Sequence, residues 1–181
     1  MGNKSFITNL VEGIKNRLKK TVTNPYKKAN LNWLKLKYYK HLNAGKLRVH
    51  KLLGKSLYFY SPSELLHGLH EIFIEEIYKQ KLNPNPYIID CGANIGLSII
   101  YMKQLYPNSE IIAFEPDETN FALLEKNIHS FQHTGVLLKK EAVWIEDTTL
   151  HFSNAGSMAS KITSEVCSDT TPTKAIRLRD F

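Results

Sequence analysis

The sequence predicts an α/β fold, with a parallel sheet and helices on both of its faces. Two observations carry this prediction. Short apolar runs rich in β-branched residues alternate with longer segments of helical pattern between residues 87 and 145. A glycine-punctuated turn at residues 92–96 separates the first apolar run from the helix that follows it. Strands and helices that alternate in this way form parallel sheets with right-handed crossovers.

Residues 1–55 are predicted to form a basic, mainly helical N-terminal arm. They hold 14 Lys or Arg and one acid, Glu12, whereas residues 56–181 hold 10 bases and 16 acids, so the two parts carry charges of +13 and −6. Apolar residues recur every four positions in residues 6–18, a pattern typical of an amphipathic helix. The break in charge therefore predicts an arm of residues 1–55 followed by a domain of residues 56–181.

Three interpretations of this arm remain open. Burial of apolar side chains together with attraction of lysines favours an anionic membrane surface or an acidic glycan. Nucleic acid is less favoured, although basic and aromatic residues alternate after residue 24. The third interpretation is a helix packed on its own domain. No secretory signal begins the chain, so we expect a cytoplasmic protein, with attachment to the inner face of a membrane as an option.

The segment before the predicted sheet contains one strand and one helix. Residues 57–60 are predicted to form a short strand, and a helix follows over residues 64–80. Ser63 is the expected N-cap, with Pro62 just outside the helix. The prolines in residues 82–86 end it.

The predicted sheet begins at residue 87, and its elements alternate regularly. They are a strand at 87–89, a helix at 95–106, a strand at 110–114, a helix at 117–130 and a strand within 136–145. After residue 145 the sequence supports only weak strands, and the alternation of "AIRLR" predicts an edge strand. Neither the two cysteines nor the histidines have the spacing of metal ligands, so no metal site is predicted.

Two carboxylates mark the ends of adjacent predicted strands. Asp90 ends the first strand, and Glu115 follows the second, 25 residues further along. Ligands of parallel sheets bind at this edge. Asp90 would repel a pyrophosphate, and Asn94 places a side chain where G-x-G-x-x-G has its middle glycine. A cation fits better, and S-adenosylmethionine carries an ammonium and a sulfonium. Glu115 would accept hydrogen bonds from ribose hydroxyls, and Glu141 is expected near the adenine edge.

The segment "IIDCGANIGLSIIYMKQLYPNSEIIAFEPDETNFALLEKNI" resembles the cofactor half of the FkbM-type methyltransferases. The resemblance extends over about residues 50–181, and "DCGANIG" and "FEPDETN" are its most specific parts. It implies a Rossmann-like methyltransferase fold with S-adenosylmethionine as methyl donor. It further implies O-methylation of a hydroxyl on a small-molecule or glycan acceptor. The candidate cofactor-binding residues are Asp90, Cys91, Gly92, Ala93, Asn94, Gly96, Glu115 and Glu141.

The chain departs from this family after its third predicted strand. The family continues with an acidic strand and further sheet, whereas this chain ends at "AIRLRDF", so we expect the acceptor half to be missing. No general base is identified. His129, His133 and His151 are candidates by residue type only. Two alternatives stay open: a nicotinamide-dependent oxidoreductase, and a non-catalytic binding module anchored by the basic arm.

Overall fold

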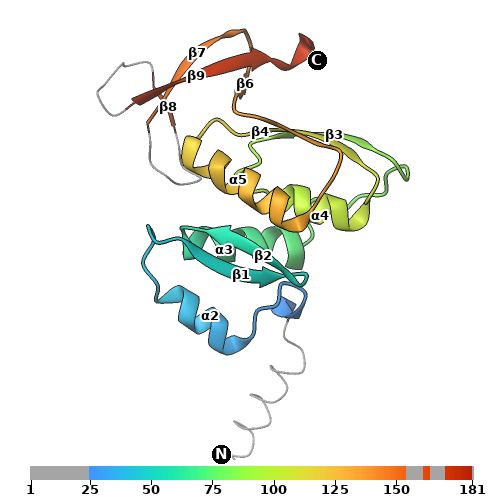
Figure 1. The fold of residues 1–181 in the computed structure, drawn as a ribbon, viewed down its shortest axis with the longest axis vertical. Coiled ribbons are helices and arrows are strands. Elements are labelled where there is room, and N and C mark those ends of the chain that lie inside the picture. Colours follow the sequence, from blue (N-terminus) through green and yellow to red (C-terminus); the bar gives the residue numbers. More distant parts are fainter. Residues whose placement is uncertain (1–24, 154–160, 164–169, 181) are drawn as a thin grey trace, which may run out of the picture.

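The computed structural model describes residues 25–153, 161–163 and 170–180, which form an α/β arrangement around three small sheets (Figure 1). The amphipathic helix predicted over residues 6–18 lies outside the described residues. No described helix has both the length and the apolar character needed to span a bilayer. In chain order the elements are η1 (Pro25–Lys27), α2 (Trp33–Lys40), β1 (Arg48–Leu52), β2 (Lys55–Phe59), α3 (Pro62–Leu69), η2 (His70–Ile74), β3 (Tyr87–Cys91), α4 (Leu97–Leu105), β4 (Glu110–Phe114), α5 (Glu118–Phe131), β5 (Val136–Lys139), β6 (Ala142–Trp144), β7 (Thr148–Ser153), β8 (Lys161–Thr163), β9 (Thr170–Arg177) and η3 (Leu178–Asp180).

The three-stranded sheet confirms the predicted parallel arrangement. Its order is β3-β4-β5, and the predicted strand at residues 110–114 coincides with β4. The register places Cys91 beside Phe114, and Phe114 beside Lys139. The three carboxyl ends therefore meet at one edge of the sheet. β4 lies in the middle, and β3 has β4 as its single neighbour among the described strands.

Helices α4 and α5 cover one face of this sheet (Figure 1). Asp117 is the N-cap of α5, because its side chain accepts a hydrogen bond of 2.8 Å from the backbone N–H of Asn120. Apolar side chains from both helices, from β4 and from the loop after β3 fill the space between the two layers. They are Ala93, Ile99, Met102, Ile111, Ala113, Leu124 and Ile128.

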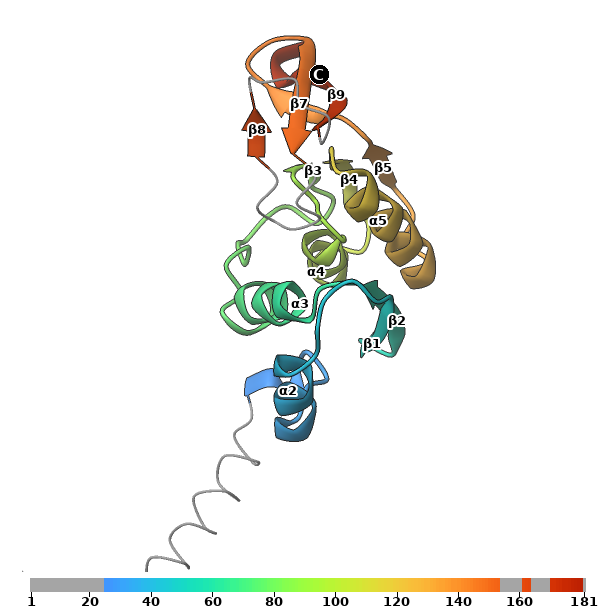
Figure 2. The same cartoon turned by 90° about the vertical axis from the view of Figure 1, so that its left-hand side faces the viewer.

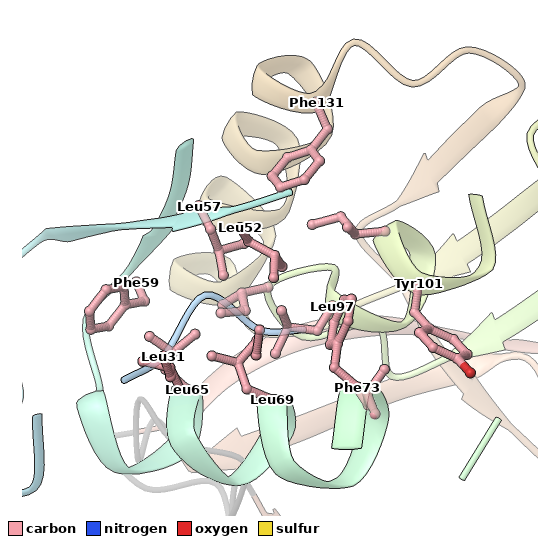
Figure 3. Packing of buried hydrophobic residues seen from close by; sticks show 14 of the residues in the cluster. Leu31, Leu52, Leu57, Phe59, Leu65, Leu69, Phe73, Leu97, Tyr101 and Phe131 are labelled. Carbon is pink, nitrogen blue, oxygen red and sulfur yellow. The ribbon is translucent and has the colours of Figure 1, made fainter. Parts of the chain in front are cut away.

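The described part of the predicted arm packs into the core. β1 and β2 form a hairpin joined by the two residues Leu53 and Gly54, so the predicted boundary between residues 55 and 56 falls inside β2. Residues 25–55 also contain a strand and part of another, besides the predicted helix. Figure 3 shows the resulting core, which the hairpin shares with α3, α4 and α5. Its largest side chains include Leu31, Leu52, Leu57, Phe59, Leu65, Leu69, Phe73, Leu97 and Phe131.

Helix α3 begins earlier and ends earlier than the sequence predicts. Ser61 is the N-cap, with its hydroxyl accepting from the Glu64 amide at 3.4 Å, and Pro62 is the first helical residue. The prediction of Ser63 as cap was wrong by two positions, since proline suits the first turn of a helix. The helix continues as the π-helical segment η2, which ends at Ile74, and two residues later Glu76 has a φ of 54°.

The strands after residue 140 form a separate sheet rather than extending the parallel one. Its order is β6-β9-β7-β8, with β6 and β9 parallel and the other neighbours antiparallel. The segment "AIRLR" lies largely in β9, which pairs on both sides with β6 and β7. Its prediction as an edge strand was wrong, because alternation does not distinguish inner antiparallel strands from edges.

Candidate functional site

The loop after β3 has backbone angles that match its sequence. Gly92 has a φ of 106° and Asn94 a φ of 49°, a region that glycine and asparagine adopt most readily. The backbone N–H groups of Gly92 and Ala93 both donate to the carbonyl of Phe114, each at 2.9 Å. The loop is thereby fixed to the carboxyl end of β4.

The two glycines of the loop serve different physical purposes. A Cβ at Gly96 would meet the Cδ1 atom of Leu124 at 2.8 Å, so this glycine lets α4 approach α5 closely. A Cβ at Gly92 would meet nothing within 4 Å. Gly92 therefore borders open space, where another molecule can approach the backbone. Gly96 is the N-cap residue of α4 and has no side chain that could accept a hydrogen bond. The first backbone N–H groups of this helix therefore lack a side-chain cap.

Asp90 lies at the carboxyl end of β3 and is held by the helix that follows. The hydroxyl of Ser98, in the first turn of α4, donates to its Oδ2 atom at 2.5 Å. Burial raises the pKa of the Asp90 carboxyl, and the hydrogen bond from Ser98 offsets part of this shift. The ionised form of the Asp90 carboxyl is therefore disfavoured in the ligand-free protein.

Glu115 follows β4 and connects the loop to the start of α5. Its side chain is buried, with 6% of the residue exposed. Oε2 accepts from the backbone N–H of Asn94 at 2.8 Å, and Oε1 accepts from that of Asp117 at 3.0 Å. Burial raises the pKa of Glu115 against these two hydrogen bonds, and the carboxylates of Asp117 and Asp90 add to the rise.

Asp90 and Glu115 have no cationic partner within the described part of the chain. Among the ion pairs that the described residues form, none includes Asp90 or Glu115. Each pKa is raised, so a positive charge brought to this edge would stabilise the ionised forms of both side chains. An additional negative charge would be repelled. The electrostatics of the site therefore favour a cationic ligand.

Two cavities adjoin this edge. The larger, about 230 Å³, lies between α3, the loop and the start of α5, and is lined by Gly92 and Asn94 among others. The smaller, about 170 Å³, is lined by Asp90 and by apolar side chains of β3 and α4. Tyr78 and Ser98 line both. Ligand pockets typically measure about 300–1,000 Å³, so each cavity accommodates part of a ligand.

The sequence prediction missed Tyr78 and Glu71. Both line the larger cavity, opposite the loop. The pKa of the Tyr78 phenol is raised by burial and then by the negative charges of Asp90 and Glu71, and Tyr78 lines the cavity of each of these carboxylates. Oε1 of Glu71 also lies 3.3 Å from Nε2 of His67. No short motif signals this contribution, because η2 and the segment after it reach the site through the packing of α3.

Asn127 was missed as well, and it connects three parts of the fold. It is fully buried in α5. Its Oδ1 accepts from the N–H of Tyr58 at 2.7 Å, and its Nδ2 donates to the carbonyls of Tyr58 at 3.0 Å and Ile95 at 2.8 Å. One side chain thus holds the hairpin strand β2 and the loop after β3 together.

Other predicted site residues lie away from the cavities. Glu141 lies between β5 and β6, where it pairs with Lys174 at 2.7 Å. It lines neither cavity. Cys91 is the last residue of β3 and is exposed, although partial desolvation of its thiol and then the charge of Asp90 raise its pKa. Ala93, in contrast, is a buried residue of the loop and lines the larger cavity.

The three histidines considered as general bases also lie elsewhere. His129 is exposed on α5, and His151 belongs to β7 in the other sheet. His133 lies beyond the end of α5, stacked on Phe131, and burial followed by the charges of two lysines lowers its pKa. None of them lines either of the two described cavities.

Comparison with curated proteins finds methyltransferases. The chain is 42% identical over 74 residues to "Methyltransferase sdnD" of Sordaria araneosa, a match covering 40% of this chain and 29% of that protein. It is 37% identical over 81 residues to "Methyltransferase 1" of Beauveria bassiana (strain ARSEF 2860), covering 44% and 32%. The chain thus spans about a third of the length of these relatives. No family model matches it.

Solved structures show a weaker likeness. A methyltransferase FkbM from Methylobacillus flagellatus KT is 15% identical, with a TM-score of 0.42 over 56% of this chain and 24% of that one. TYW2 of M. jannaschii in complex with AdoMet is 21% identical, with a TM-score of 0.39 over 54% and 45%. Likeness at this level is no basis for assigning a function. The matched curated proteins support the broad resemblance to methyltransferases, and the FkbM type stays a prediction.

Proposed function

We propose that this chain binds S-adenosylmethionine at the loop after β3 and is the cofactor-binding part of a methyltransferase. The observation that carries the proposal is the pair of carboxylates at Asp90 and Glu115. They occupy the ends of adjacent parallel strands, and each has a raised pKa. A ligand with a sulfonium and an ammonium compensates such charges. The similarity to two named methyltransferases over 74 and 81 residues supports the same assignment.

The residues around the loop suit the two ends of this cofactor. Each oxygen of Glu115 accepts one backbone N–H and has a second lone pair for a ribose hydroxyl. Asp90, Tyr78 and Glu71 surround the junction of the two cavities and suit the ammonium of the methionine part. The uncapped N-terminus of α4 suits its carboxylate, because the N–H groups and the helix dipole favour negative charge there.

The chemistry of the bound cofactor is an activated methyl group on its sulfonium. This chain's residues would hold and orient the cofactor, and correct positioning supplies much of the rate enhancement in such transfers. The acceptor we propose is a hydroxyl of a small molecule or glycan, on the basis of the sequence resemblance alone. The described residues offer no histidine at the cavities to accept the hydroxyl proton.

A nicotinamide-dependent oxidoreductase is less favoured by the same geometry. A dinucleotide would bring its doubly negative pyrophosphate to the loop, close to Asp90 and Glu115, whose ionised forms already lack a cation among the described ion pairs. The side chain of Asn94 also lines the cavity where such a ligand needs bare backbone. A non-catalytic module that binds S-adenosylmethionine without transferring its methyl group would have the same site.

Isothermal titration of the full chain with S-adenosylmethionine, S-adenosylhomocysteine and NAD tests the proposal. We expect heat of binding for the first two and none for NAD. Replacement of Asp90 by Asn should weaken binding, whereas replacement of the exposed Glu118 by Gln should leave it unchanged. Binding of NAD in preference to both sulfur ligands would refute the assignment. A methyl-transfer assay with candidate hydroxyl acceptors then separates an enzyme from a binding module.

A further inference from the structure

Helix α2 presents an outward face that is both apolar and basic. Trp33, Leu34 and Tyr38 are 66%, 67% and 61% exposed, which is unusual for three large apolar side chains on one short helix. With about 100° between successive residues, they lie within one half of the helix surface together with Lys37 and Lys40.

The opposite side of the helix is packed and therefore fixes this face outward. Tyr39 is buried, and its hydroxyl donates to Nδ1 of His50 at 3.2 Å. Nε2 of His50 in turn donates to the carbonyl of Ala29 at 2.8 Å. This buried chain of hydrogen bonds, together with packing of Tyr39 on Phe59, holds α2 against the hairpin. The exposed apolar face is thus a consequence of the fold and not of a loosely placed helix.

The chain segment that carries this face has charges of one sign. Residues 25–55 contain nine Lys or Arg and no Asp or Glu, although the rest of the chain from residue 56 is acidic. The ammonium of Lys37 lies 5.6 Å from the ring centroid of Trp33, so positive charge stands directly beside exposed aromatic surface. A partner that complements this face is negatively charged and accepts apolar side chains beneath its charged layer.

We propose that the outward face of α2 docks on an anionic lipid bilayer. Trp33 and Tyr38 have the amphipathic rings that favour the headgroup region, and Leu34 inserts more deeply. Lysines beside them keep their ammonium groups at the lipid phosphates. Nucleic acid complements the charge and stacks on aromatic rings, but it offers no apolar layer for Leu34, so the bilayer fits the whole face better.

The position of α2 in the fold suits this role. Figures 1 and 2 place it at one end of the described structure, beyond the hairpin and far from the β6–β9 sheet. The loop between β3 and α4 lies on the other side of α3 and the hairpin (Figure 2). Residues of this loop line the larger cavity, and Asp90 at the end of β3 lines the smaller one. Docking through α2 would therefore leave the proposed cofactor site accessible from solution.

The test uses the full chain with Trp144 replaced by Phe, which leaves Trp33 as the single tryptophan of the chain. The probe is vesicles of phosphatidylcholine with about one third phosphatidylserine, with pure phosphatidylcholine as reference. We expect a blue shift of Trp33 emission and co-sedimentation with the anionic vesicles only. Both should weaken as salt is raised.

Variants then separate the face from charge in general. Replacement of Lys37 and Lys40 by Gln should weaken vesicle binding about 25-fold, or about fivefold per lysine. The matched control, Lys81 and Lys140 replaced by Gln, removes the same charge elsewhere and should leave the face intact. Replacement of Leu34 by Ser should weaken binding at every salt concentration. Circular dichroism would verify that each variant is folded.

Three outcomes would overturn the proposal. The first is equal loss of binding in the α2 variants and in the matched control, which would reduce the effect to net charge. The second is vesicle binding without a shift of Trp33 emission, which would locate the contact elsewhere in the chain. The third is tighter binding to a single-stranded oligonucleotide of the same charge than to the vesicles.

Discussion

Replacement of Asp90 by Asn removes one charge from the site and keeps the shape of the side chain. The amide oxygen can still accept the hydrogen bond from Ser98. Hydrogen bonds to charged groups are worth about 1.5–3 kcal/mol, so S-adenosylmethionine should bind about 10- to 150-fold more weakly if its cationic end contacts Asp90.

The same substitution should not destabilise the ligand-free protein near neutral pH. Burial raises the pKa of Asp90, so the ionised carboxylate costs folding free energy above that pKa and costs none where it is protonated in both states. Asn removes this cost. The free energy of unfolding should therefore stay level or rise at neutral pH, and the difference from the parent should vanish at acidic pH.

Titration calorimetry and urea unfolding of the parent and the variant measure the two effects. Weaker binding together with unchanged or higher stability is the expected combination, because a ligand-binding charge is being removed. The reasoning is refuted if the variant is less stable and binds equally well. That pair of results would make Asp90 a structural residue whose charge the fold requires.

Further predictions concern the loop. Replacement of Glu115 by Gln should lower the free energy of unfolding by about 1.5–3 kcal/mol, since the amide can accept from only one of the two N–H groups that the carboxylate holds. Replacement of Glu118 by Gln, which breaks an exposed pair with Lys140, should lower it by less than about 1 kcal/mol. Replacement of Gly96 by Ala should lower the free energy of unfolding by about 2–5 kcal/mol, from backbone strain and the contact with α5, whereas replacement of Gly92 by Ala should lower it by only about 1–3 kcal/mol, from strain alone. Equal losses of stability for the two variants in chemical unfolding would contradict this packing. Affinity for S-adenosylmethionine should rise with pH as the raised pKa values of Asp90 and Glu115 are passed, and binding at mildly acidic pH should release protons, which calorimetry in buffers of different ionisation enthalpy detects. Affinity that is constant between acidic and neutral pH would argue against contact with the carboxylates.

The parallel sheet and its loop could be predicted from sequence because their determinants are local. β4 is an apolar run bounded by Pro107-Asn108 and by Pro116, and the turn at residues 92–96 contains glycines where φ is positive. Asp90 and Glu115 were found for the same reason, since the carboxyl end of a strand is visible in the pattern. The order of β3 and β4 then follows from the crossover rule.

The hairpin of β1 and β2 was missed because its turn has an unusual residue. Leu53 and Gly54 have φ values of 50° and 79°, a two-residue turn for which asparagine and glycine are the common signal. Leucine seldom adopts such an angle, so residues 57–60 were predicted as a strand without a hairpin partner, and residues 1–55 were assigned to a mainly helical arm. Tyr78 and Glu71 were missed because their approach to the loop depends on the packing of α3, which no short motif encodes.

The hydrogen bonds of Asn127 imply that the hairpin and the loop share one equilibrium. The amide that holds the carbonyl of Ile95 also holds both backbone groups of Tyr58, so displacement of the loop leaves the shared Asn127 side chain with an unsatisfied N–H in a buried place and weakens its hold on the hairpin. A molecule that orders the loop must then also tighten the hairpin, and the effect is reciprocal. Amide exchange at Tyr58, a residue that lines neither cavity, should therefore slow when the carboxylate edge is filled.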